Sequence, residues 1–294
     1  MTGGTDVPAT AHHPADLDAA WFEPFRPWAA RSDPRPAGRI DLAQLNALAA
    51  ARGVRTEDGL PLCFIDARAS SAAGYEASIG ESGAVPTRAV GPGMLHDWFN
   101  ALAWLAFPRI KARLNRLHRH ALAVRARGCA GGGTVGERGM APSLPAGRGL
   151  LRDAATLLDE SGALFVCRDP ALAVALRNRD WRALFVDQRA RFAAGAAVRV
   201  LGHGLCEKLR APYKSVCAHA WLVELPSGLL EGVPDEIPDE TLDAAVAQQL
   251  RPDTLRVARL HPLPLLGVPG WWPPNADPAF YDDARVFRRK RRER

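Results

Sequence analysis

His203 and Glu207 stand four residues apart and carry the clearest chemical signal in the sequence. If this segment is helical, both side chains project from one face. An imidazole and a carboxylate placed in this way can supply two ligands to Zn, Mn or Fe. Without a metal, Glu207 can orient His203 as a general base. A hydrogen-bonded pair with only a structural role is the third interpretation, and the sequence leaves all three open.

Other segments supply further candidates for such a site. His96 and His219 are additional metal donors, and Lys208 and Lys214 can neutralise a carboxylate or phosphate of a small anionic substrate. Asp153 is a further polar candidate. We therefore predict a catalytic set of His203, Glu207, Lys208, Lys214, His96 and Asp153, and a divalent-metal set of His203, Glu207, His96 and His219.

Two other motifs are assigned no chemistry. Gly131, Gly133 and Gly136 satisfy the spacing GxGxxG, but an arginine-rich helix precedes them where a dinucleotide site needs a strand. The adjacent carboxylates Asp159 and Glu160 are interpreted as the turn of a hairpin, because neighbouring residues of a strand point to opposite faces.

The positive charge is concentrated in two places. The formal net charge is +6, and residues 288–294 hold six bases and one acid, which leaves only +1 for the rest of the chain. The segment Arg109–Arg127 is rich in arginine and lies in a stretch, 98–136, without any acid. This helix and the basic tail give the alternative function, a binding protein that contacts nucleic acid or an acidic partner. The acidic run 231–243 is its natural intramolecular cover.

These groups must be positioned by a mostly helical α+β fold with a small antiparallel or mixed sheet and a proline-rich C-terminal wrap. Hydrophobic periodicity, caps and prolines predict the elements. We expect an extended strap over 21–36, helices over 41–52, 96–127 with a break at Pro108, 170–192 and 197–210, and strands at 61–66, in a hairpin over 155–166 and at 217–225.

The domain organisation follows from composition. We predict a disordered N-terminus over 1–20, one globular domain over 21–287 and a basic tail over 288–294. A subdomain break, if there is one, falls in the glycine-rich segment 128–149. The longest nearly unbroken apolar stretch, 98–107, is about half the ~20 residues of a membrane-spanning helix. No secretory signal precedes the domain, so we expect a cytoplasmic protein.

Several long segments resemble a bacterial family known as domain of unknown function 3025. The segments are HDWFNALAWLAFPRIKARLN (96–115), LRDAATLLDESGALFV (151–166), GHGLCEKL (202–209), PYK (212–214) and PLPLLGVPGWWPPNADPAFYDDARVFR (262–288). They cover most of the chain from about Trp21 onward. The resemblance implies membership of that family and no particular chemistry.

Two functions therefore remain open, and the sequence does not decide whether the protein is an enzyme. As an enzyme it would be a hydrolase or lyase of a small anionic substrate, which requires His96, Asp153, His203 and Lys214 to converge in one pocket. As a binding protein it would need a continuous positive surface that the segment 231–243 leaves uncovered.

Overall fold

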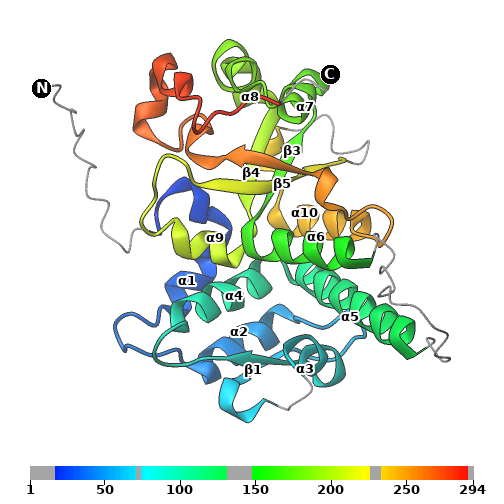
Figure 1. The fold of residues 1–294 in the computed structure, drawn as a ribbon. Helices are drawn as coiled ribbons and strands as arrows, with labels where there is room; N and C mark the ends of the chain where they lie inside the picture. The colour runs from blue at the N-terminus through cyan, green and yellow to red at the C-terminus, as the bar shows by residue number, and fades with distance from the viewer. Residues whose placement is uncertain (1–16, 71–73, 131–147, 226–232, 291–294) are drawn as a thin grey trace, which may run out of the picture.

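The large sheet of the protein has four strands in the order β4-β3-β5-β6 (Figure 1). The computed structural model describes residues 17–70, 74–130, 148–225 and 233–290. The strands are β3 (Gly162–Cys167), β4 (Ala196–Val200), β5 (Cys217–Val223) and β6 (Leu260–Pro264). β3 runs parallel to β5, whereas β4 and β6 pair antiparallel at the two edges. The mixed sheet and the surrounding helices confirm the predicted α+β class.

A second layer holds the helical first half of the chain. α4 (Met94–Ala106) and α5 (Pro108–Ala130) are separated at Phe107, which confirms the predicted break. α10 (Asp239–Gln249) lies against the start of α5, where the Asp243 carboxylate accepts hydrogen bonds from the amides of Arg109 (3.0 Å) and Ile110 (2.8 Å). The acidic segment therefore caps this basic helix at its N-terminus.

A small two-stranded sheet closes the far side of this layer. β1 (Cys63–Asp66) runs parallel to β2 (Ala84–Thr87), and α3 (Tyr75–Ser82) lies between them in the chain. α2 (Leu42–Arg52) begins as predicted, where the Asp41 side chain accepts a hydrogen bond from the Gln44 amide. It ends as predicted at Gly53, which has a left-handed φ of 69°.

The predicted hairpin over 155–166 is wrong. α6 (Arg148–Ser161) continues through Asp159 and Glu160 and passes directly into β3. Leu151, Ala154, Ala155 and Leu158 are buried at helical spacing, so one face of α6 packs on the core. A Cβ at Gly162 would lie 2.1 Å from the Leu158 carbonyl oxygen, and this close approach explains the glycine that resembled a turn signal.

Two further predictions differ from the structure. The helix predicted over 197–210 is wrong for its first half, and the extended strap predicted over 21–36 is wrong. The first half of 197–210 is strand β4, and α9 spans only His203–Lys208. The strap is instead a 3-10 helix, η1 (Ala20–Phe25), followed by α1 (Arg26–Ser32). Its aromatic side chains Trp21, Phe22 and Phe25 are buried, and burial outweighs the proline signal there.

Most of the remaining helical segments lie at one end of the large sheet (Figure 1). α7 (Pro170–Asn178), a π-helical turn (Ala183–Asp187) and α8 (Arg189–Gly195) lie there, as the helices predicted over 170–192. The C-terminal wrap packs against them, since the Trp181 indole donates to the Arg288 carbonyl at 2.9 Å. The other short 3-10 helices are η2 (Ala67–Ala69), η5 (Pro234–Glu236), η6 (Val257–Arg259), η7 (Leu265–Gly267), η8 (Pro273–Ala276) and η9 (Pro278–Asp282).

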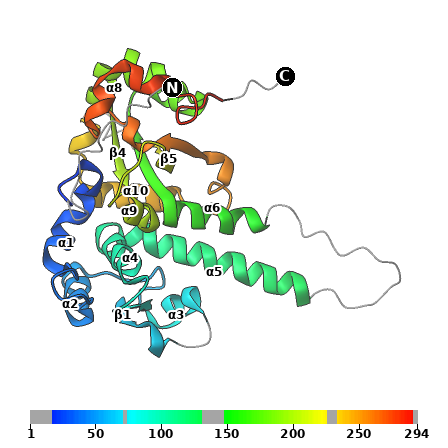
Figure 2. The same ribbon diagram turned by 60° about the vertical axis from the view of Figure 1, so that its left-hand side comes forward.

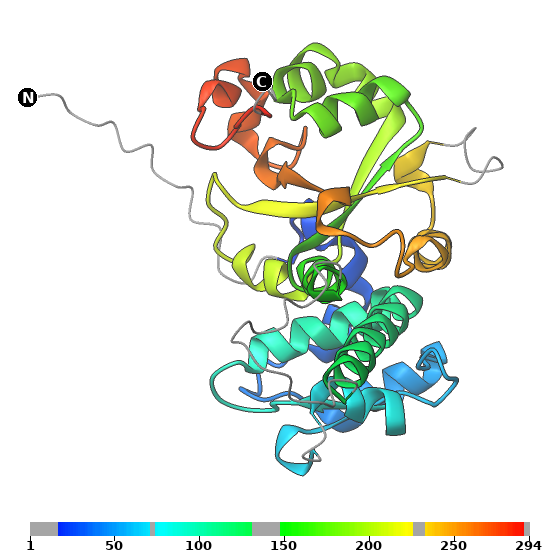
Figure 3. The same cartoon turned by 45° about the vertical axis from the view of Figure 1, so that its right-hand side comes forward.

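α6 occupies the boundary between the two layers. Figures 1 and 3 show α6 and α9 below the large sheet and above α4 and α5. Figure 2 shows α5 and α6 running side by side away from the body of the protein. Among the described residues, no helix is both long and apolar enough to cross a membrane. The predicted glycine motif at 131–136, most of the predicted disordered N-terminus and residues 291–294 of the basic tail lie outside the described residues.

The cap on α5 gives a test of this packing. We expect Asp243→Ala to lower the free energy of unfolding by about 1–2 kcal/mol, because two amides of the first turn of α5 lose their acceptor. Urea denaturation would measure the loss. Asp253→Ala, at an exposed loop carboxylate, is the control. Equal effects of the two substitutions would contradict the proposed role of Asp243.

Candidate functional site

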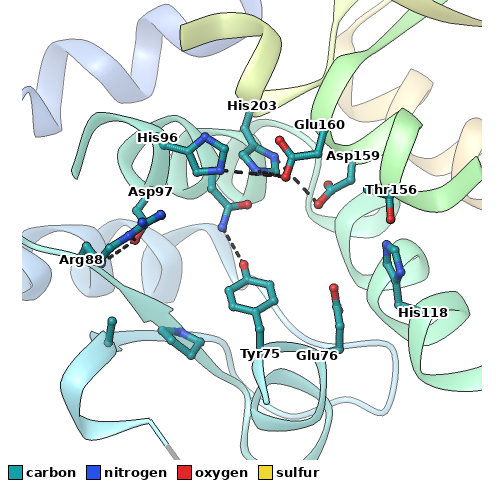
Figure 4. Close-up of a pocket in the computed structure, with 13 residues that line it drawn as sticks. Tyr75, Glu76, Arg88, His96, Asp97, His118, Thr156, Asp159, Glu160 and His203 are labelled. Carbon is teal, nitrogen blue, oxygen red and sulfur yellow. Dashed lines mark hydrogen bonds and ion pairs between the residues drawn. The ribbon is translucent and has the colours of Figure 1, made fainter. Parts of the chain in front are cut away.

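A cavity of about 350 Å³ opens where α4, α6 and α9 face α3 and the segment after β2 (Figure 4). Its wall is unusually rich in polar and titratable side chains, which come from segments far apart in the sequence. The lining residues are Ala67, Tyr75, Glu76, Pro86, Arg88, His96, Asp97, Asn100, His118, Thr156, Asp159, Glu160 and His203.

Two histidines and a glutamate converge on one side of this cavity. The Nε2 atom of His203 lies 3.4 Å from the Glu160 Oε1 atom, and that of His96 lies 4.0 Å from the same oxygen. The two imidazole rings meet edge to face, with centroids 4.7 Å apart. One ligand atom from each of the three residues lies within 4.8 Å of the other two. Two imidazoles and one carboxylate in this arrangement could hold a divalent metal ion.

Two glycines permit the three side chains to meet. His96 lies near the start of α4, Glu160 in the last turn of α6, and His203 at the start of α9. A Cβ at Gly202 would lie 2.5–2.6 Å from backbone atoms of the α6–β3 junction, so this position has no room for a side chain. A Cβ at Gly204 would lie 2.5 Å from the Glu160 carboxylate. The sequence Gly-His-Gly therefore brings His203 against Glu160.

Each histidine turns its other ring nitrogen toward a second carboxylate. The Nδ1 atom of His96 lies 3.2 Å from the Glu207 Oε2 atom, within hydrogen-bond distance. The Nδ1 atom of His203 is buried without a hydrogen-bond partner among the described residues, and the Asp159 Oδ2 atom lies 3.9 Å from it. A carboxylate behind an imidazole fixes the ring tautomer and directs the Nε2 lone pair forward. For His96, Glu207 provides this arrangement.

Asp159 is held in its charged form by a buried lysine. The Lys111 ammonium, only 3% exposed, donates to Asp159 and to the Asn100 Oδ1 atom (2.9 Å). Burial alone would raise the pKa of Asp159, but the charges of Lys111 and His203 hold it below its usual value. The Asn100 amide in turn donates to the Tyr75 hydroxyl at 2.6 Å (Figure 4). A continuous polar chain thus crosses the back of the cavity.

The opposite wall of the cavity contains Glu76, whose carboxyl group, unlike that of Asp159, is partly protonated near neutral pH. Burial, together with the negative charge of Asp159, raises the pKa of Glu76 to about 7. The Asn115 side-chain amide donates to the Glu76 Oε2 atom at 2.6 Å and fixes the orientation of the carboxyl group. In contrast, the hydrogen bond from His203 lowers the pKa of Glu160 despite its partial burial. Two carboxyl groups of one cavity therefore differ in protonation near neutral pH.

The structure brings together only part of the predicted site. His96 and His203 line the cavity, and Glu207 joins it through His96 instead of through His203. Four predicted residues lie elsewhere. Lys208 and Asp153 are exposed and outside the cavity, His219 lies on β5, and Lys214 contacts Asp283 (3.4 Å) and the Phe280 ring (4.5 Å).

Sequence reasoning missed Glu160, Asp159 and Lys111. Asp159 and Glu160 were assigned to a turn, although the buried positions at 151, 154, 155 and 158 already have helical spacing. Lys111 falls inside the segment Arg109–Arg127, which the sequence indicated as a basic helix. It precedes Leu114 by three residues, and this spacing places it on the apolar stripe of α5. Helical periodicity would have indicated all three, if it had been followed through the polar residues.

Three arginines of α5 form ion pairs, and their partners are not the acidic run 231–243 that the sequence predicted. Arg113 contacts Glu57 at 2.8 Å, and Arg116 and Arg119 contact Asp58 at 3.3 and 2.7 Å. These acids come from the loop before β1, whereas the segment 231–243 contributes the Asp243 cap. The described part of α5 thus has carboxylates along much of its basic face, which weakens the case for a continuous phosphate-binding surface.

Comparison with known proteins gives a family and no activity. The family model described as "Protein of unknown function (DUF3025)" matches residues 62–291. No curated protein and no solved structure matches the chain. The matched segment contains all of the residues that form the cavity, and it spans far more than half of the sequence. The chain belongs to the DUF3025 family.

Proposed function

We propose that this protein is a metal-dependent hydrolase of a small substrate, with one divalent ion such as Zn²⁺ held by His96, Glu160 and His203. The observation that supports this proposal is the approach of three ligand atoms to within 4.8 Å. Imidazole and carboxylate ligands suit Zn²⁺, Mn²⁺ and Fe²⁺. Three protein ligands leave coordination positions for water and substrate, as catalytic sites require.

The orientation of the imidazoles favours a cation over a metal-free histidine base. Glu207 faces the Nδ1 atom of His96, so the proton belongs on Nδ1 and the Nε2 lone pair points toward Glu160. The Nε2 atom of His203 faces the same carboxylate oxygen. Without a cation, His203 donates its Nε2 proton to Glu160, but the His96 Nε2 lone pair then faces the same oxygen with no proton between them, and two electron-pair donors that face each other repel. A divalent ion satisfies all three groups at once.

The carboxylates of this wall also favour a cation. Glu160, Glu207 and Asp159 surround the two imidazoles, and among the described residues Lys111 is the basic side chain that contacts one of them. These three carboxylates and the one ammonium give a net charge of −2 before any proton on the histidines is counted. A divalent ion would neutralise this charge, and its bound water would become a nucleophile near neutral pH.

Glu76 is the acid–base group of the proposed reaction. Its pKa of about 7 allows it to accept a proton from an attacking water and to return that proton to the leaving group. Asn115 holds one oxygen of the carboxyl group, and Figure 4 shows the side chain on the wall across from the histidines. Placed there, Glu76 faces a substrate that occupies the cavity.

Arg88 provides the contact for an anionic group of the substrate. Its Nε and Nη2 atoms donate to Asp97 at 2.9 and 2.6 Å, which leaves Nη1 outside this pair. The side chain lines the cavity and is half exposed. Arg88 thus takes the role that the sequence suggested for Lys208 and Lys214. A cavity of about 350 Å³ restricts the substrate to a small molecule.

Metal content gives the first test. We expect protein purified without a chelator or a histidine tag to retain close to one equivalent of metal, and His203→Ala and Glu160→Gln to lose it. Elemental analysis would measure the content, and circular dichroism would show that the variants are folded. His219→Ala is the control because His219 lies outside the cluster. A metal-free protein that also fails to bind added Zn²⁺ would refute the proposed site.

The substitution Glu207→Gln tests whether Glu207 only positions His96 or itself binds the metal. We expect this variant to bind the same amount of metal at saturation, with an affinity lowered about 10- to 100-fold, because Glu207 contacts the ring of His96 from behind. Competition with a metal-chelating dye would measure the affinity. Complete loss of metal would instead identify Glu207 as a ligand.

An open coordination position gives the test of hydrolase chemistry. We expect added acetohydroxamate, which binds metals through two oxygens, to change the visible absorption of the cobalt(II)-loaded protein. Catalytic sites keep a position for such a molecule, whereas structural sites are closed. Acetamide, which has the same carbonyl group but lacks the N-hydroxyl of the hydroxamate, is the control. An unchanged spectrum at saturating acetohydroxamate would contradict a hydrolase.

The raised pKa of Glu76 predicts a pH-dependent effect on stability. The unfolded carboxyl ionises near pH 4.3 but the folded one near pH 7, so ionisation disfavours the folded state increasingly over this interval and fully above it. We expect Glu76→Gln to be stabilised relative to wild type by about 3 kcal/mol more at pH 8 than at pH 4.5. Urea denaturation would measure this difference. Glu81→Gln, exposed on the same helix, is the control, and a pH-independent effect of Glu76→Gln would contradict the assignment.

A further inference from the structure

A second cavity, of about 660 Å³, lies between the end of α2, the start of α5 and α10. It shares no lining residue with the cavity that holds the histidines. Four arginines face it from two parts of the chain, Arg52 and Arg55 at and just after the end of α2, and Arg109 and Arg113 at the start of α5. Such a concentration of guanidinium groups in one concave surface is typical of sites that bind phosphate or carboxylate groups.

The acids of this cavity are already engaged. Glu57 contacts Arg113 at 2.8 Å, and Glu240 contacts Arg52 at 3.2 Å. The third lining carboxylate, Asp243, accepts from the amides at the start of α5. In the described part of the chain, no carboxylate forms an ion pair with Arg55 or Arg109, although the charge of Arg109 acts on the nearby Asp243 carboxylate, where it partly offsets the rise in pKa that burial causes.

Several guanidinium donors of the cavity are also unused. The Nε atoms of Arg52 and Arg113 are buried and have no hydrogen-bond partner among the described residues. Arg55 donates from Nη1 to the Gly59 carbonyl at 2.9 Å. The Arg109 guanidinium forms no hydrogen bond or ion pair with any of the described residues. Buried donors of a charged group are normally satisfied. A bound anion would supply acceptors to this group of arginines.

We infer that this cavity binds a small phosphorylated molecule, whose phosphate contacts Arg55 and Arg109. A phosphate presents enough oxygens for several guanidinium groups at once, which a single carboxylate does not. The N-terminus of α5 lies at the same wall, since Pro108 and Arg109 line the cavity, and Asp243 already caps its first amides.

The rest of the cavity suits the organic part of such a ligand. Its volume is larger than a lone phosphate needs and lies within the usual range for small-molecule sites. Ala112, Ala244 and Ala247 form a wall of small apolar side chains beside the arginines. The charged and apolar halves together match a phosphorylated metabolite better than an inorganic ion alone.

Isothermal titration calorimetry with inorganic pyrophosphate would test this inference on the full-length protein. We expect saturable binding that weakens as salt rises, and a loss of at least about tenfold in affinity in Arg55→Gln/Arg109→Gln. The control is Arg39→Gln/Arg256→Gln, which removes the same charge at two exposed positions outside the cavity and should bind as wild type does.

Two further measurements test whether pyrophosphate binds in this cavity and not elsewhere on the protein. Glu160→Gln should bind pyrophosphate as wild type does, and a loss there would place the anion at the histidine site and overturn the inference. A single-stranded DNA of ten nucleotides should compete weakly at most. Binding of the DNA without binding of pyrophosphate, no binding of pyrophosphate at millimolar concentration, or equal losses in the two double variants would each overturn the inference as well.

Discussion

The buried ion pair of Lys111 and Asp159 is the interaction on which the rest of the site depends. Lys111 is 3% exposed, and its ammonium links α5 to the last turn of α6. A buried charge without a partner is strongly destabilising, so each member of the pair holds the other in place. The next residue, Glu160, is thereby held toward His96 and His203. The position of the proposed metal ligand thus follows from a contact made one residue earlier.

One negative charge also connects the two walls of the cavity. Asp159 remains ionised because Lys111 and His203 are close, and its charge contributes to the raised pKa of Glu76. The same carboxylate therefore lies behind a proposed metal ligand and tunes the proposed acid–base group. Coupling of this kind is typical of catalytic sites, where neighbouring titratable groups are driven to different protonation states.

The first turns of α5 separate the two cavities. Lys111 points toward the histidine site, while its neighbours Arg109, Ala112 and Arg113 line the arginine-rich cavity. Asp243 caps this helix, so α10 also fixes the shared wall. A ligand that contacts Arg109 would act on the same helical turn that holds Asp159. The geometry makes α5 the physical link between the proposed catalytic centre and the proposed anion site.

The sequence by itself determined the elements whose signals are local. Asp41 and Gly53 delimit α2, Pro108 separates α4 from α5, and short apolar runs mark β1 and β5. It also indicated His96 and His203 as polar residues worth attention. Tertiary structure alone decided that Glu160 and not His219 lies with them, and that 196–200 is a strand and not a helix. The physical reason is the distance along the chain over which each signal acts. Caps, prolines and periodicity act within one element, whereas the site arises where α4, α6 and α9 pack together around the close backbone contact of Gly202 with the α6–β3 junction.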